Sequence, residues 1–219
     1  MKPLQFPRSV ASLAALLVLL ASAAKAQTFS IDFQAGVLTD RFGDPLSDGR
    51  LVLLVADTGN DGFGPLLSGR ALHTGSFLNS DDQILFGTSI DSDSFGAGSI
   101  VGSATGLKFS DFPSLTVGRS LALIWFSSAT SESLSGGEEY GLFTGGLTPL
   151  AGNPWAVPAQ GALIELSFLT DAVDEGVYSS LLGQTSHTVS AIPEPSTYAV
   201  LLGLAVLGFA AYRRRSRSG

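Results

Sequence analysis

The amino-acid sequence predicts an all-β fold, an antiparallel β-sandwich or jelly roll, flanked by an N-terminal signal helix and one C-terminal transmembrane helix. Short apolar stretches alternate with segments rich in Gly, Ser, Asp and Asn, and no stretch between the two ends keeps helical spacing beyond about two turns. About eight to ten short strands joined by polar loops are typical of a sandwich or jelly roll. The predicted strands are residues 28–33, 50–57, 83–90, 99–101, 106–109, 121–126, 139–143 and 162–169.

The first element, residues 1–26, has the pattern of a secretory signal peptide. Lys2 and Arg8 give a positive start, residues 13–20 form a short apolar core, and Ala24 and Ala26 form an A-x-A-like cleavage site. The apolar core is too short to favour a membrane-spanning helix. The sequence therefore predicts export and excludes residues 1–26 from the folded domain.

The next elements are strands of two kinds. In residues 28–33, Phe29, Ile31 and Phe33 alternate with polar residues, which predicts a strand with one buried face. Residues 51–56 are continuously apolar, which predicts a strand covered on both faces. The predicted β domain spans residues 27–182, in which 173–182 also fit a short helix. Residues 183–192 are small and polar, and fit either a last edge strand or a spacer to the membrane.

The last element is an uncharged stretch at residues 196–212, about 25 Å long as a helix. This length is at the short limit for a transmembrane helix. Arg213, Arg214 and Arg215 follow it and mark the cytoplasmic end. With the signal peptide at the other end, the sequence predicts a single-pass membrane protein whose β domain lies outside and whose C-terminus lies in the cytoplasm.

Residues 193–195, Pro-Glu-Pro, precede this stretch. Proline fixes φ and disfavours helix in the preceding residue, so this tripeptide is expected to be extended just outside the membrane. Residues 193–219 resemble the PEP-CTERM sorting signal. The resemblance rests on three parts in order: Pro193, Glu194 and Pro195, then the short apolar span, then Arg213, Arg214 and Arg215. The resemblance implies that an exosortase, a membrane transpeptidase, recognises Glu194 and processes the tail, leaving the protein at the cell surface or in the extracellular matrix. An ordinary C-terminal anchor is the alternative.

Charge and composition exclude several classes of function. Residues 27–192 carry 18 acidic and five basic side chains, a net charge of −13. Such a surface repels nucleic acid and anionic lipid headgroups, so no nucleic-acid partner is expected. The chain has no cysteine, which excludes disulfides, thiol catalysis and thiolate metal sites.

One loop, residues 57–62, has acidic residues at a spacing that suggests calcium. Asp57 and Asp61 are the candidate ligands, but Gly59 and Ser68 stand where an EF-hand needs Asp or Asn and a bidentate Glu. The loop is not an EF-hand. It is either a different cage of oxygen ligands or a tight turn, for which Asp, Asn and Gly are the usual residues.

No catalytic motif is present, and the sequence predicts no catalytic residue, no enzyme activity and no cofactor other than this calcium candidate. Glu138, Glu139 and Glu165 could pair as in a glycosidase, and His73 or His187 would have to serve any serine triad. The favoured hypothesis is a non-enzymatic structural or adhesive component linked to exopolysaccharide. The alternative is a carbohydrate-binding or carbohydrate-active module. Buried Trp125 and Trp155 would favour the first, and an exposed aromatic platform with carboxylates the second.

Overall fold

The computed structural model describes residues 27–130, 133–145, 155–168, 183–191, 202 and 204–207. The predicted signal peptide with Ala24 and Ala26 lies outside these residues, and so do the predicted helix at 173–182 and the Pro-Glu-Pro and Arg positions of the tail.

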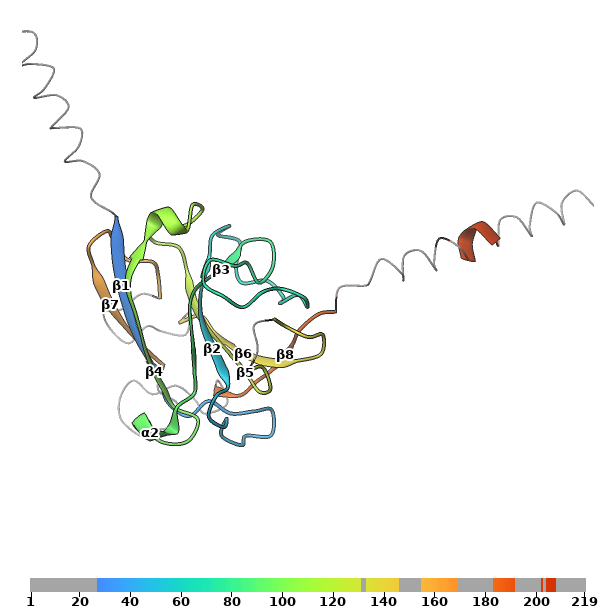
Figure 1. Cartoon of the computed structure of the whole chain (residues 1–219), viewed down its shortest axis with the longest axis horizontal. Helices are drawn as coiled ribbons and strands as arrows, with labels where there is room; N and C mark the ends of the chain where they lie inside the picture. Colours follow the sequence, from blue (N-terminus) through green and yellow to red (C-terminus); the bar gives the residue numbers. More distant parts are fainter. Residues whose placement is uncertain are drawn as a thin grey trace, which may run out of the picture.

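The described residues form two β-sheets with almost no helix, which confirms the predicted β class. The three-stranded sheet has the order β4-β1-β7 and the five-stranded sheet the order β3-β2-β5-β6-β8. The three strands of the first sheet are β1 (Thr28–Ala35), β4 (Ile100–Lys108) and β7 (Leu163–Phe168). Those of the second are β2 (Leu51–Asp57), β3 (Asp82–Ser89), β5 (Leu121–Phe126), β6 (Glu139–Phe143) and β8 (His187–Thr188). The two sheets form separate layers (Figure 1).

The prediction of a purely antiparallel fold was wrong at one pairing. Strand β1 pairs with β7 in parallel, with Asp32 opposite Glu165, whereas the other pairs of strands in the described residues are antiparallel. A long stretch of chain separates β1 from β7, and a long connection permits either direction, whereas a tight hairpin permits only the antiparallel one.

A second difference concerns β4, one strand where two were predicted. Gly102 lies inside it, and a Cβ on this residue would come within 2.2 Å of the Phe33 ring. This strand therefore needs a glycine here to pair closely with β1. The sequence predicted separate strands at 99–101 and 106–109, and a glycine inside a strand resembles a turn signal.

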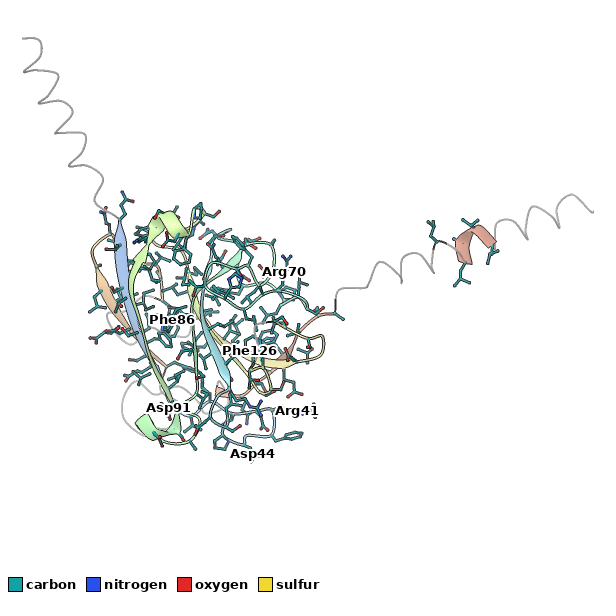
Figure 2. The ribbon with its side chains drawn as sticks, in the orientation of Figure 1. Arg41, Asp44, Arg70, Phe86, Asp91 and Phe126 are labelled. Carbon is teal, nitrogen blue, oxygen red and sulfur yellow. The ribbon has the colours of Figure 1, made fainter. Side chains whose placement is uncertain are left out.

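The main hydrophobic core lies between the two sheets. Phe29, Ile31 and Phe33 of β1 are at most 2% exposed, as their alternation predicted, and they share one cluster with Leu123 and Trp125 of β5. Side chains fill the space between the layers, and Phe86, labelled in Figure 2, packs edge-on against Phe33. Because one continuous core joins both sheets, they fold as one unit.

The five-stranded sheet is buried on its other face as well. Leu53, Val55 and Ile124 point into a second cluster, which loop residues such as Leu66, Leu78 and Val189 complete. The continuously apolar run at 51–56 is thereby confirmed as a strand covered on both faces: residues 52–57 are all buried. Among the described residues, connecting segments cover this second face of the sheet.

Residues 183–191 are part of this fold. Of the two interpretations of the segment, an edge strand or a spacer, the edge strand holds for His187–Thr188, which pairs with β6. The Val189 amide donates to the Glu138 carbonyl oxygen (2.8 Å), and the Ser190 amide to the Leu66 carbonyl oxygen (2.8 Å). The chain is therefore held to the domain as far as Ser190, three residues before Pro193.

Candidate functional site

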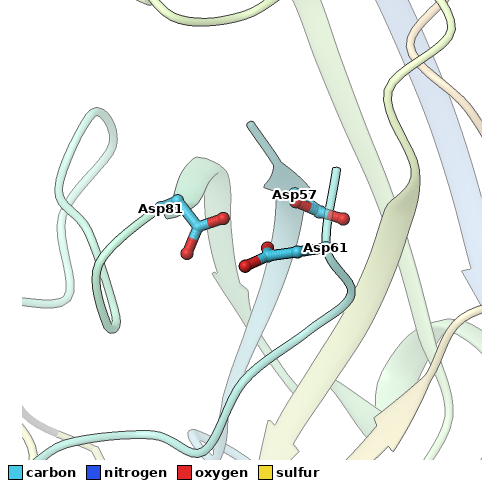
Figure 3. A group of neighbouring side chains, drawn as sticks. All are labelled: Asp57, Asp61 and Asp81. Carbon is cyan, nitrogen blue, oxygen red and sulfur yellow. The ribbon is translucent and has the colours of Figure 1, made fainter. Parts of the chain in front are cut away.

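Four aspartates meet where β2 ends and β3 begins. Asp57 is the last residue of β2, Asp82 is the first residue of β3, and the two are directly opposite in the antiparallel pairing. Asp61 lies in the loop after β2, and Asp81 precedes β3. Carboxylate oxygens of Asp57, Asp61 and Asp81 all lie within 4.8 Å of one another (Figure 3).

Asp57 organises the loop that follows it. The side chain is 2% exposed, and its Oδ1 and Oδ2 accept hydrogen bonds from the backbone amides of Asn60 (2.5 Å) and Gly62 (2.9 Å). Asn60 has φ of 65° and Gly62 has φ of 94°, conformations that Asn and Gly tolerate best. The carboxylate of Asp57 therefore folds the loop back, which brings Asp61 over the end of the sheet.

Asp61 and Asp81 face each other across this loop (Figure 3). The Asp81 backbone is held by Thr58, whose hydroxyl donates to the Asp81 carbonyl oxygen (2.7 Å), and the Ser80 hydroxyl donates to Oδ1 of Asp81 (2.7 Å). This bond from Ser80 lowers the pKa of Asp81, while the neighbouring Asp81 carboxyl, by sharing a proton and by repulsion, raises the pKa of Asp61. The facing carboxyls of Asp61 and Asp81 are therefore stabilised by one positive charge between them, such as a shared proton.

Gly59 leaves the space that Asp81 occupies. A Cβ on Gly59 would lie 1.9 Å from Oδ2 of Asp81 and 2.9 Å from Oδ1 of Asp61. Any other residue at position 59 would therefore displace one or both carboxylates. The glycine that rules out an EF-hand is the residue that lets these side chains approach the loop backbone.

Asp82 is the most deeply buried of the four, at 1% exposed. Its Oδ2 accepts hydrogen bonds from the Asn79 side-chain amide and from the Gly64 backbone amide, the latter at 2.9 Å. Oδ1 of Asn79 in turn accepts the amides of Asp81 and Asp82. Burial raises the pKa of Asp82 to about 6, because the charged form loses water that the hydrogen bonds only partly replace.

Asp57 and Asp61, the two predicted calcium candidates, are thus close together, and sequence reasoning missed their neighbours Asp81 and Asp82. The sequence did contain one indication of them, because Asp81 and Asp82 directly precede the predicted strand at 83–90. The pairing of β2 with β3 was required to place them, since antiparallel pairing brings the end of one strand beside the start of the next.

The carboxylates considered for glycosidase chemistry are not brought together. Glu139 is the first residue of β6 in the five-stranded sheet and pairs with Arg41 at 2.7 Å, and Glu138 directly precedes this strand. Glu165 lies on β7 of the other sheet. His73 contacts the Ser76 hydroxyl (2.9 Å) within one exposed turn. His187 is exposed and stacks on Tyr140 at the sheet edge.

A different polar group lies on the outer face of the three-stranded sheet. Asp32 and Glu165 are register neighbours on β1 and β7, and with Gln34 and Ser167 they line a depression of about 130 Å³. The Gln34 side-chain amide donates to the Ser167 hydroxyl (3.0 Å). Sequence analysis did not identify this group, because the parallel β1–β7 pairing that creates it was not predicted.

The predicted membrane helix at 196–212 is described only at residues 202 and 204–207, which are helical. Leu202, Leu204 and Leu207 are each more than 60% exposed. Within the part of the chain that the structure describes, no helix reaches the length and apolar character needed to cross a membrane.

Comparison with protein families identifies a sorting motif at the C-terminal end of the chain. Residues 191–215 match the model described as the PEP-CTERM protein-sorting motif, which confirms the resemblance drawn from Pro193, Glu194, Pro195 and the arginines. Comparisons with curated proteins and with solved structures found no match. The matched segment begins at Ala191, one residue after Ser190, whose backbone is hydrogen-bonded to the loop at 66–68. The chain is therefore a protein with a PEP-CTERM protein-sorting motif at its C-terminal end, a motif that indicates export and exosortase-dependent sorting.

Proposed function

We propose that an exosortase recognises Pro193-Glu194-Pro195 and processes this protein after export, and that the β domain then acts as a non-enzymatic structural or adhesive component associated with exopolysaccharide. The match of residues 191–215 to the sorting motif carries the first part. A cleavable signal peptide with Ala24 and Ala26, a transmembrane helix at 196–212 and Arg213–Arg215 on the cytoplasmic side complete the proposed route.

The character of the domain supports the second part. Trp125 and Trp155, the two residues best suited to stack on sugar rings, are 0% and 8% exposed and pack on Phe168 and Phe143. The exposed Phe42 has the Arg41 guanidinium over its ring, 4.6 Å from the centroid, so one ring face is already occupied. These aromatic groups serve packing, as expected for a structural component.

The experiment for the sorting step is a Glu194→Ala substitution in a host that contains an exosortase. We expect the variant to stay in the membrane fraction at full length, because the residue between the two prolines is the recognition charge. The matched control is Glu138→Ala, which removes the same charge from a half-buried position in the β domain. Normal release of the Glu194→Ala protein on an immunoblot of membrane and medium fractions would show that the motif is not read in this way.

The alternative function is carbohydrate binding or turnover, and the outer face of the three-stranded sheet favours it. Carboxylate, amide and hydroxyl groups of Asp32, Gln34 and Ser167 line one depression there, a combination suited to sugar hydroxyls. Incubation with a panel of polysaccharides separates the hypotheses. Binding or cleavage that a Gln34→Ala substitution abolishes would support the alternative, and an inert domain supports the structural role.

A further inference from the structure

The aspartates at the β2–β3 end lack any basic partner. Neither Lys, Arg nor His forms an ion pair with Asp57, Asp61, Asp81 or Asp82 among the described residues. Two of these side chains, Asp57 and Asp82, are at most 2% exposed. Carboxylates held together in this way repel one another, and burial removes the water that would screen them. The arrangement therefore favours a bound proton or cation.

Two buried oxygens of this group have no hydrogen-bond partner. Oδ1 of Asp82 is unpaired on a side chain that is 1% exposed and lies beside Asp57 on the same face of the sheet. Oδ2 of Asp81 is also a buried atom, and it lies against Gly59 next to Asp61; when both carboxyls are ionised it has no hydrogen-bond donor. Buried polar atoms in proteins are rarely left unpaired, so these two oxygens point to a ligand that the protein atoms do not supply.

From these contacts we propose that Asp57, Asp61 and Asp81 form a binding site for one divalent cation, Ca²⁺. A Ca–O distance of about 2.4 Å allows two oxygens on one ion to be up to about 4.8 Å apart. The three carboxylates meet this limit, with mutual separations within 4.8 Å. The ion would neutralise the facing carboxylates of Asp61 and Asp81 and fix the loop that Asp57 folds.

The ligand chemistry favours calcium over other metals. The donors are all oxygens, with neither His nor Cys among them, which suits Ca²⁺ or Mg²⁺ and not the metals that prefer nitrogen or sulfur. Asp61 is exposed, so water can complete an irregular coordination shell, which Ca²⁺ accepts and Mg²⁺ tolerates poorly. Exported proteins meet calcium at concentrations that suit the Kd of about 10⁻⁴ to 10⁻³ M seen in extracellular calcium modules.

The test is calcium binding by the full-length chain, purified in a nonionic detergent and freed of metal with EGTA. We expect isothermal titration calorimetry to detect one site. In about 10 mM calcium, roughly ten times the weaker Kd, the thermal midpoint should rise by about 3 to 6 °C above that in sodium chloride of matched ionic strength. Magnesium should give a smaller shift. A rise no greater than the one in sodium would overturn the proposal.

Three variants locate the site. Asp61→Asn removes an exposed ligand and should weaken binding at least tenfold. Gly59→Ala keeps every carboxylate but displaces Asp81, so it should also abolish the calcium-specific shift, which general charge screening would not explain. Asp93→Asn makes the same charge change at an exposed position in the short helix α2 (Ser92–Phe95) and should bind as the parent protein does. Retention of the full shift by either of the first two variants, or its loss in the third, would refute the site.

Discussion

At the residue scale, glycines decide how closely the elements approach. Gly141 of β6 lies opposite Trp125 of β5, and a Cβ on Gly141 would lie 2.0 Å from Cε2 of the indole. Trp125 is fully buried and packs against Phe168, with ring centroids 5.7 Å apart. The largest core side chain and the smallest residue are therefore paired, and each position restricts the other.

This pairing predicts energetic coupling between the two positions. Gly141→Ala should destabilise the domain by about 1 to 3 kcal/mol, because the indole cannot move without disturbing the core. Trp125→Phe removes the ring atoms that would clash with the added methyl group. The loss of stability in the double variant should therefore be smaller than the sum of the losses in the two single variants, by about 0.5 to 3 kcal/mol.

Urea unfolding of the parent, the two singles and the double variant measures this coupling. Phe126→Leu is the control partner, since Phe126 packs in the other cluster, on the opposite face of the sheet, and its effect should add to that of Gly141→Ala. Additive effects for the Trp125 and Gly141 pair would contradict the prediction.

At the element scale, the last strand connects the domain to the sorting motif. Strand β8 is only two residues long, but Thr185, Ser186, Val189 and Ser190 add backbone hydrogen bonds to the loop at 39, to β6 and to the loop at 66–68. Val189 is 3% exposed and belongs to the outer hydrophobic cluster. The chain is therefore held to the domain up to Ser190, one residue before the matched sorting motif begins.

The element-scale prediction compares two chain ends. A protein of residues 27–192 should be more stable than one of residues 27–182 by at least about 2 kcal/mol, since the shorter chain exposes the site of Val189 and loses several buried hydrogen bonds. Denaturant unfolding of both proteins measures the difference. Equal stabilities would show that residues 183–191 contribute nothing to the fold.

At the scale of the whole molecule, two unequal sheets share one core, and the larger sheet carries a second core under its loops. Residues 27–192 carry a net charge of −13, and no disulfide offsets the repulsion between the acidic side chains. Hydrophobic burial on both faces of β2 and β5 supplies the stability instead.

The whole-molecule prediction is that residues 27–192 fold without either end of the chain. Both cores are made from residues within this range, so neither terminal segment is needed to complete them. Far-ultraviolet circular dichroism should show a β spectrum and thermal unfolding should be a single cooperative transition. A helical spectrum would show that the strand period was misassigned, and a gradual transition would show that the ends are required.

The sequence by itself determined the features that depend on local pattern. Alternation in residues 28–33 and the apolar run at 51–56 predicted two strands and their burial, because side-chain period and apolar content directly reflect which faces are covered. The tail was recognised from Pro193, Glu194, Pro195 and the arginines for the same reason, since a linear signal is read along the chain. Asp57 and Asp61 were identifiable as neighbours in one loop.

Only the tertiary structure decided what depends on pairing between distant segments. The parallel β1–β7 pairing, which places Asp32 beside Glu165, joins residues that no local pattern connects. The pairing of β2 with β3 brings Asp81 to Asp57 and Asp61, and the contact at Gly59 sets how closely they approach. The physical reason is that strand register and direction follow from packing of the whole core, so a site formed by several strand ends exists only after that core has formed.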